Sequence, residues 1–172
     1  MIDNLGRYIL GFISIFLVQV LILNNLNLGG FINPWLYVLF ILILPVEIPN
    51  WLLMLIGFTT GLLIDIFLNS IGLHASATVF LAFIRPMLLR SFAPRDGYEK
   101  GSLPLPSHFG FSWFFKYAIL AVMAHHLFLH IVEVFTFDNI FSTIWKSILS
   151  SLATLLTIFI ALLFTGSNKQ RN

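Results

Sequence analysis

Three ionisable side chains fall on one face of a strongly apolar segment near the C-terminus, where they could do chemistry together. In the stretch AHHLFLHIVEVF, the residues His126, His130 and Glu133 are spaced at i, i+4 and i+7, so a helix brings them to one side. An HxxxH pair on a helix can bind zinc, but the HExxH signature is missing and the chain has no cysteine. We expect histidines that are hydrogen-bonded across helices, with a metal or proton-relay site as the alternative.

A carboxylate in another apolar segment is the next candidate. In the stretch GFTTGLLIDIF, the residues Gly57, Gly61 and Asp65 are spaced four apart and share one helix face. Because glycines let a second backbone approach closely, we expect this face to pack against a helix and to form an interface inside the bundle or with a partner. Asp65 then points into protein; the alternative is a carboxylate that reaches headgroup water. Catalysis is not expected, because no second positioned group is evident.

The following segment repeats this arrangement of polar and small residues. His74, Thr78, Ala82 and Arg85 fall on one helix face, with His74 toward the outer end and Arg85 toward the cytoplasm. Arg85 could contact lipid phosphate by snorkelling or bind an acidic group of a partner. The polar residues of the three segments predict one outward-facing polar pocket, lined by Asp65, His74, His126, His130 and Glu133.

The composition explains why these polar residues are informative. Of the 172 residues 59% are hydrophobic and only 9% are charged, whereas a soluble domain has about 25% charged residues. Such a chain cannot solvate its own surface, so it is an integral membrane protein with a single domain, residues 1–172. Secreted, cytosolic and nucleic-acid-binding classes are excluded together.

The apolar runs predict an all-α, polytopic bundle of six transmembrane helices. The expected spans are about 5–23, 31–48, 51–68, 71–89, 113–135 and 141–164, with a polar cytoplasmic loop over 90–112. The second span is the least regular, because Pro45 and Pro49 interrupt it. We expect a tilted or kinked span there, or else a re-entrant segment.

Positive charge predicts the orientation of the bundle. With six spans and both termini in the cytoplasm, all Lys and Arg residues except Lys146 lie inside, as the positive-inside rule favours. Together with Arg85, the loop residues Arg90, Arg95 and Lys100 are expected to make basic contacts with anionic lipid or with a cytoplasmic partner.

The last span carries small polar residues on a stripe that suits close helix contacts. Its members are Ser147, Ser150, Ser151, Thr154, Thr157 and Ala161. Several helices therefore have slim faces, which favours a compact bundle and leaves room for the membrane helix of another protein.

Residues 57–86, GFTTGLLIDIFLNSIGLHASATVFLAFIRP, resemble the signature region of the rod shape-determining protein MreD family, and its Bacteroidetes-type members most closely. The length of the chain, the number of spans and the short second segment also fit this family. The histidines of the fifth span match no motif of the family. The matching positions are Gly57, Gly61, Leu62, Asp65, Phe67, Gly72, His74 and Arg85-Pro86.

The resemblance implies a non-enzymatic scaffold of the bacterial inner membrane that needs no cofactor or metal. Proteins of this family associate with MreC and connect MreB filaments to peptidoglycan synthesis by the glycosyltransferase RodA and its transpeptidase partner. Their fold is thought to be similar to the substrate-binding component of energy-coupling-factor transporters. A small-molecule-binding component of a transporter is therefore the alternative function. An intramembrane enzyme is a third possibility, for which no sequence signature is recognisable.

Overall fold

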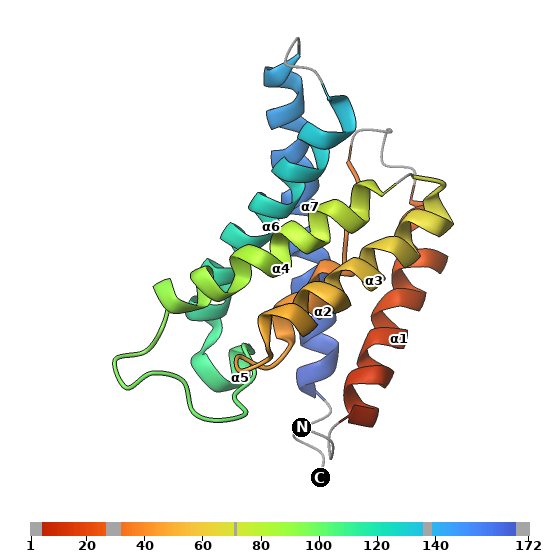
Figure 1. Ribbon diagram of the computed structural model, residues 1–172. Coiled ribbons are helices and arrows are strands. Elements are labelled where there is room, and N and C mark those ends of the chain that lie inside the picture. The colour runs from red at the N-terminus through yellow and green to blue at the C-terminus, as the bar shows by residue number, and fades with distance from the viewer. Residues whose placement is uncertain (1–4, 27–31, 71, 136–138, 168–172) are drawn as a thin grey trace.

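The computed structural model describes residues 5–26, 32–70, 72–135 and 139–167, and over these residues it contains helices and connecting segments but no β-strand (Figure 1). The longer helices lie within a few residues of five of the six expected spans. In chain order the elements are α1 (Leu5–Leu21), the 3₁₀ turn η2 (Leu23–Asn25), α2 (Val38–Ile43), α3 (Asn50–Leu68), α4 (Leu73–Ser91), α5 (Pro106–Phe109), α6 (Phe111–Val134) and α7 (Ile140–Ser167).

Four of the described helical segments are long and apolar enough to cross a bilayer. Their mean hydropathy runs from 1.6 to 2.3, and even the shortest has 18 residues. A helix of that length rises about 27 Å, close to the thickness of the hydrocarbon core. The protein is therefore a helical membrane protein. The four segments are Tyr8–Asn25, Asn50–Leu68, Phe111–Val134 and Ile140–Phe164.

The helix α4 has 19 residues, like α3, but is more polar than the four apolar segments. Its polar side chains are turned into the protein: His74, Thr78 and Arg85 are all buried. In contrast, Phe83 and Met87 on the same helix are more than half exposed. The apolar face of α4 is therefore directed outward and its polar face toward the other helices, the reverse of a soluble protein.

The segment between α1 and α3 differs from the helix that we expected over 31–48. Only Val38–Ile43 is helical there, and six residues rise about 9 Å, far less than the hydrocarbon thickness. The helix ends because Leu44, which precedes Pro45, is forced out of the helical conformation and takes ψ 152°. The expected second helix is thus replaced by a short helix with irregular flanks.

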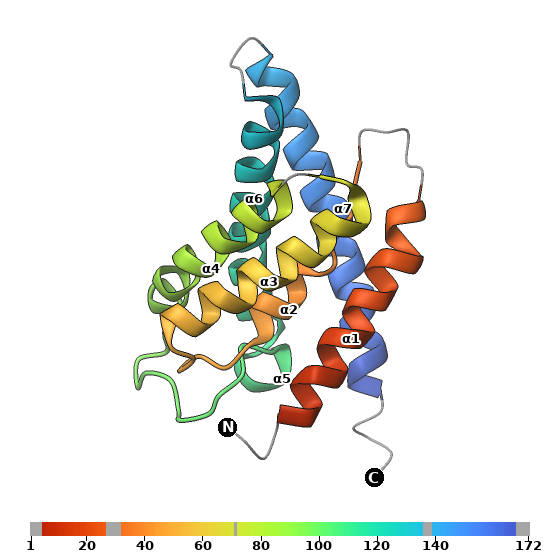
Figure 2. The same ribbon diagram turned by 45° about the vertical axis from the view of Figure 1, so that its right-hand side comes forward.

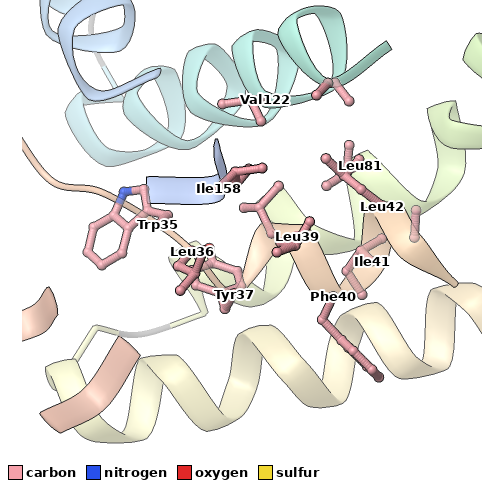
Figure 3. Packing of buried hydrophobic residues seen from close by; sticks show 14 of the residues in the cluster. Trp35, Leu36, Tyr37, Leu39, Phe40, Ile41, Leu42, Leu81, Val122 and Ile158 are labelled. Carbon is pink, nitrogen blue, oxygen red and sulfur yellow. The ribbon is translucent and has the colours of Figure 1, made fainter. Parts of the chain in front are cut away.

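The short helix α2 lies at the centre of the molecule. Val38, Ile41 and Leu42 have no exposed surface. They pack with apolar side chains from three other helices, among them Leu81 of α4 and Ile158 of α7 (Figure 3). Figures 1 and 2 show α3 and α4 as a hairpin that crosses α6 and α7 at a steep angle, with α1 on the other side of α2.

The ends of the helices define two ends of the molecule. The beginning of α1, the end of α7, α5 and the loop after α4 lie at one end, and the end of α6 and the beginning of α7 lie at the other (Figure 1). We refer to them below as the terminal end and the hairpin end. The end of α3 and the beginning of α4 also lie toward the hairpin end.

Candidate functional site

Asp65 lies near the end of α3 and caps the beginning of α4. Its carboxylate accepts hydrogen bonds from the Ser70 hydroxyl at 2.6 Å and from the backbone N–H groups of His74 at 3.0 Å and Ala75 at 2.9 Å. N–H groups in the first turn of a helix have no partner within that helix, and the positive end of the helix dipole favours an anion. Asp65 therefore holds the two helices together through the cap.

Gly57 and Gly61 bring the backbones of α3 and α4 together below this cap. A Cβ atom at Gly61 would lie 2.5 Å from both the Cα of Ala75 and the carbonyl oxygen of His74. At Gly57 the corresponding distance to the Thr78 carbonyl oxygen is 3.0 Å. The stripe of Gly57, Gly61 and Asp65 thus packs against α4 of the same chain, which covers it.

His74 follows the cap and contacts Tyr37, the residue directly before α2. The Tyr37 hydroxyl lies 2.9 Å from Nδ1 of His74 and 3.0 Å from Nε2 of His125, and all three side chains are buried. A hydroxyl has one proton, so it donates to one ring and accepts from the other. This one group therefore joins α2, α4 and α6.

His126, the next residue on α6, is hydrogen-bonded at both ring nitrogens. Its Nδ1 lies 2.9 Å from the Val122 carbonyl oxygen and its Nε2 lies 3.0 Å from the Thr154 hydroxyl of α7. The same hydroxyl accepts the backbone N–H of Trp35 at 2.8 Å. Thr154 therefore links α6 and α7 to the irregular segment before α2.

The backbone of that irregular segment finds further partners on α1 and α7. The N–H of Asn33 donates to the Ser150 hydroxyl at 3.3 Å, and the N–H of Tyr37 donates to the Gln19 side chain at 3.3 Å. The Gln19 amide donates in turn to the Pro34 carbonyl at 3.2 Å. A bilayer offers no water to such groups, so the polar stripe of α7 stabilises a non-helical backbone.

Arg85 is buried, with 1% of its surface exposed, and the prediction of a cytoplasmic or lipid contact at this residue is wrong. Its guanidinium donates to the carbonyl oxygens of Leu42, Leu44 and Pro45, and its Nε donates to the Tyr117 hydroxyl at 3.2 Å. These carbonyls lie at the end of α2, where helical partners are missing. Arg85 therefore caps α2 instead of snorkelling to the surface.

His130 and Glu133 lie at the hairpin end of α6, close to Lys146 of α7. His130 is buried, and its Nδ1 lies 2.9 Å from the His126 carbonyl oxygen. Its Nε2 lies 4.0 Å from the Glu133 carboxylate, which pairs with the Lys146 ammonium at 2.9 Å. The Glu133 side chain is 42% exposed, so this end of the polar row reaches solvent or headgroups.

The residues expected to line an open pocket form a buried row instead. Asp65, His74, His126 and His130 are each 5% exposed or less, and only Glu133 is accessible. The row also includes Tyr37 and His125, which we did not predict as site residues. In the described part of the chain, no group of three or more His, Asp and Glu side chains is placed to hold a metal ion.

The last turn of α4 and the loop after it carry the other predicted basic residues at the terminal end. Arg90, Arg95 and Lys100 are exposed there, so they can meet lipid headgroups or a partner. The loop is held by Tyr98, whose hydroxyl donates to the Leu89 carbonyl at 2.6 Å. Burial raises the pKa of Tyr98 to about 12, so the phenol stays protonated, and this bond persists, at physiological pH.

Comparisons with known proteins add no identification. No protein-family model, curated protein or solved structure matches this chain. The functional interpretation therefore depends on the geometry of the helices and on the resemblance of residues 57–86.

Proposed function

We propose that the protein is a non-enzymatic scaffold of the bacterial inner membrane, similar to MreD, that binds MreC and helps to regulate cell shape and peptidoglycan synthesis. In this proposal the chain crosses the membrane six times, with segment 32–49 as the second crossing and both termini in the cytoplasm. The proposal is supported by the position of the chain ends, because α1 begins and α7 ends at the same end of the molecule. We include in it a fold similar to the substrate-binding component of energy-coupling-factor transporters.

The observation that carries the proposal is the use of the polar residues inside the protein. The positions that resemble the family signature make helix contacts: Gly57 and Gly61 admit α4, Asp65 caps it, and Arg85 caps α2. We prefer a scaffold to a small-molecule-binding component, because four of the five side chains expected in an open pocket are buried. His74 and His126 are hydrogen-bonded to Tyr37 and Thr154 inside the protein.

The partner surface that we propose is a groove on the outer side of the α3–α4 hairpin. It has a volume of about 510 Å³, and small residues, Gly72, Ala75 and Ser76, are part of its lining, with Phe58 and Phe83 at its more exposed rim. Small residues allow the backbone of a neighbouring membrane helix to approach closely. We propose the single membrane helix of MreC as the occupant.

The terminal end supplies the remaining part of the proposal. The exposed Arg90, Arg95 and Lys100 would face the cytoplasm, where anionic lipid and MreB filaments are the proposed contacts. RodA and its transpeptidase partner would then be reached through MreC.

The test is affinity purification of the tagged protein from its native membrane, with identification of the proteins that come with it. Ser76→Phe fills the groove, whereas Leu152→Phe adds the same ring on a lipid-facing position of α7. We expect MreC to co-purify with the unchanged protein and with Leu152→Phe, and its yield to fall at least fivefold with Ser76→Phe at equal membrane levels.

Two outcomes would count against the proposal in different ways. Absence of MreC from every preparation removes the scaffold function. Equal yields of MreC with Ser76→Phe and Leu152→Phe leave the scaffold but remove the groove as its binding surface.

A further inference from the structure

Two histidines of α6, His126 and His130, have the same local hydrogen bond but different neighbours at the other ring nitrogen. In each, Nδ1 lies 2.9 Å from the carbonyl oxygen four residues earlier. A carbonyl only accepts hydrogen bonds, so Nδ1 carries the proton in both rings. A neutral ring with a protonated Nδ1 has a lone pair on Nε2, and the two Nε2 atoms differ in what they meet.

At His126 the lone pair of Nε2 already accepts a hydrogen bond. The Thr154 hydroxyl accepts the Trp35 N–H, so its own proton is free to be donated to Nε2 of His126. A proton added to this Nε2 would meet a hydroxyl that already donates toward it. His126 is therefore held in its neutral form by its hydrogen bonds.

At His130 the lone pair faces a carboxylate. Nε2 lies 4.0 Å from Oε2 of Glu133, and within the described residues no donor reaches it at hydrogen-bonding distance. Both atoms are acceptors, so the contact is unfavourable until a proton lies between them. Glu133 is 42% exposed, which gives such a proton a route from the aqueous phase at the hairpin end.

We propose that His130 and Glu133 form a proton-binding site that exchanges with the aqueous phase at the hairpin end of the molecule. One proton from water adds to the Nε2 lone pair and converts the imidazole to an imidazolium ion; no other bond is made or broken. The new N–H donates to the Glu133 carboxylate, which is then shared between His130 and Lys146.

The charged and titratable groups around His130 act in opposite directions. On α6, Glu133 favours the imidazolium, whereas His126 offers only a neutral ring and its carbonyl. On α7, Lys146 opposes the added charge, and so would His74 of α4 if it were protonated. Burial of the ring opposes the added charge first, and Lys146 adds to this effect. Proton binding therefore depends on whether Glu133 outweighs both.

Proton uptake would change the contact between α6 and α7. Among the described residues, Glu133 bonds only to Lys146 of α7 in the neutral state, whereas in the charged state it also bonds within α6. The site would make the hairpin end sensitive to acidity on that side of the membrane. This inference does not depend on the identity of a partner.

The direct test is NMR of the protein with ¹⁵N-labelled histidine in lipid nanodiscs, recorded from about pH 8 to about pH 5. His130 and His126 are assigned by single His→Asn variants. We expect both rings to show a protonated Nδ1 and an unprotonated Nε2 near pH 8. On acidification the Nε2 signal of His130 should move to the protonated form, while that of His126 stays unchanged.

Two surface variants give opposite expected shifts, which a purely structural role would not produce. Glu133→Gln removes the favourable charge, so His130 should need about tenfold more protons for half-conversion; Lys146→Gln removes the opposing charge and should lower that requirement. If His130 keeps a bare Nε2 down to about pH 5, or if both variants behave like the unchanged protein, the proposed site does not exist.

Discussion

At the scale of single residues, Asp65 shows why a carboxylate is tolerated inside an apolar chain. It is 3% exposed, yet it accepts three hydrogen bonds, two of them from the first turn of α4. Hydrogen bonds to an ionised acceptor contribute about 1.5–3 kcal/mol each, whereas a buried N–H without a partner costs about 1–3 kcal/mol. The loss of this side chain therefore affects α4 more than α3.

We predict that Asp65→Ala lowers the stability of the protein by about 2–4 kcal/mol, because the N–H groups of His74 and Ala75 lose their acceptor. Asp65→Asn keeps one acceptor oxygen and should cost about half as much. Thermal unfolding in detergent, followed by circular dichroism, measures both. Equal stability of the two variants would argue against the cap.

A pair of glycines tests the close approach of the helices. Gly61→Ala places a methyl group 2.5 Å from the backbone of α4 and should destabilise the protein by about 1–3 kcal/mol. Gly11→Ala in α1 meets nothing within 4 Å and should be neutral or stabilising by up to about 1 kcal/mol. The same unfolding experiment compares them. A stabilising Gly61→Ala would contradict the packing described for α3 and α4.

At the scale of elements, α2 depends on residues outside itself. Six residues make too short a helix to be stable alone, so its ends are held by others: Gln19 and Thr154 bind the segment before it, and Arg85 binds its last carbonyls. The burial of a charged group is tolerated at Arg85 because several carbonyls and a hydroxyl surround the guanidinium.

We predict that Arg85→Met destabilises the protein by about 2–4 kcal/mol, because the buried carbonyls at the end of α2 lose their donor. Arg90→Met, one helix turn or so further on, removes an exposed guanidinium and should change stability by less than about 0.5 kcal/mol. The fraction of folded protein in a denaturant series distinguishes the two. Similar losses for both variants would contradict a capping role.

The elements also show what the sequence could predict. Long apolar runs predicted α1, α3, α4, α6 and α7, because length and hydropathy are sufficient for helices of this kind. The interruption at Pro45 was predicted, but the short length of α2 was not, because an apolar run does not reveal whether its surroundings are lipid or protein. Whether this segment folds as a helix depends on hydrogen-bond acceptors and donors from α1, α4 and α7, which lie far away in the sequence.

The same limit applies to the side chains of the candidate site. Spacing placed Gly57, Gly61 and Asp65 on one face, but it could not identify α4 as the helix that covers this face. The spacing placed Arg85 on one helix face with His74 and Thr78, but the contact expected for Arg85 was wrong. Spacing shows which residues share a helix face and does not show what packs against that face. Tyr37 escaped notice because it is a single polar residue within an apolar run, and His125 because it lies outside the i, i+4, i+7 spacing of His126, His130 and Glu133.

At the scale of the whole molecule, polar groups are gathered along its interior and apolar groups cover its outside. The row from Asp65 to Glu133 runs through the half of the bundle toward the hairpin end, and Arg85 lies in the other half. Apolar residues of α2 occupy the space between, among them Val38 and Ile41. These apolar side chains therefore separate the polar row from the terminal end of the molecule.

We predict that the two ends of the molecule face opposite sides of the membrane. The chain has no cysteine, so Phe141→Cys at the hairpin end and Arg95→Cys in the loop can each be labelled alone. A membrane-impermeant maleimide should label Phe141→Cys in intact spheroplasts and Arg95→Cys only after permeabilisation. Labelling of both from outside would rule out the six-crossing topology.

The hydrogen bond between the Trp35 backbone and Thr154 has a consequence for how the protein is made. The two residues are 119 positions apart, so the second segment leaves the ribosome long before its acceptor does. Until the last helix has been inserted, the N–H groups of Asn33 and Trp35 lack the hydroxyls that receive them. Since hydrocarbon cannot replace these acceptors, biogenesis must shelter the early segment in the translocon or at the membrane surface until synthesis is complete.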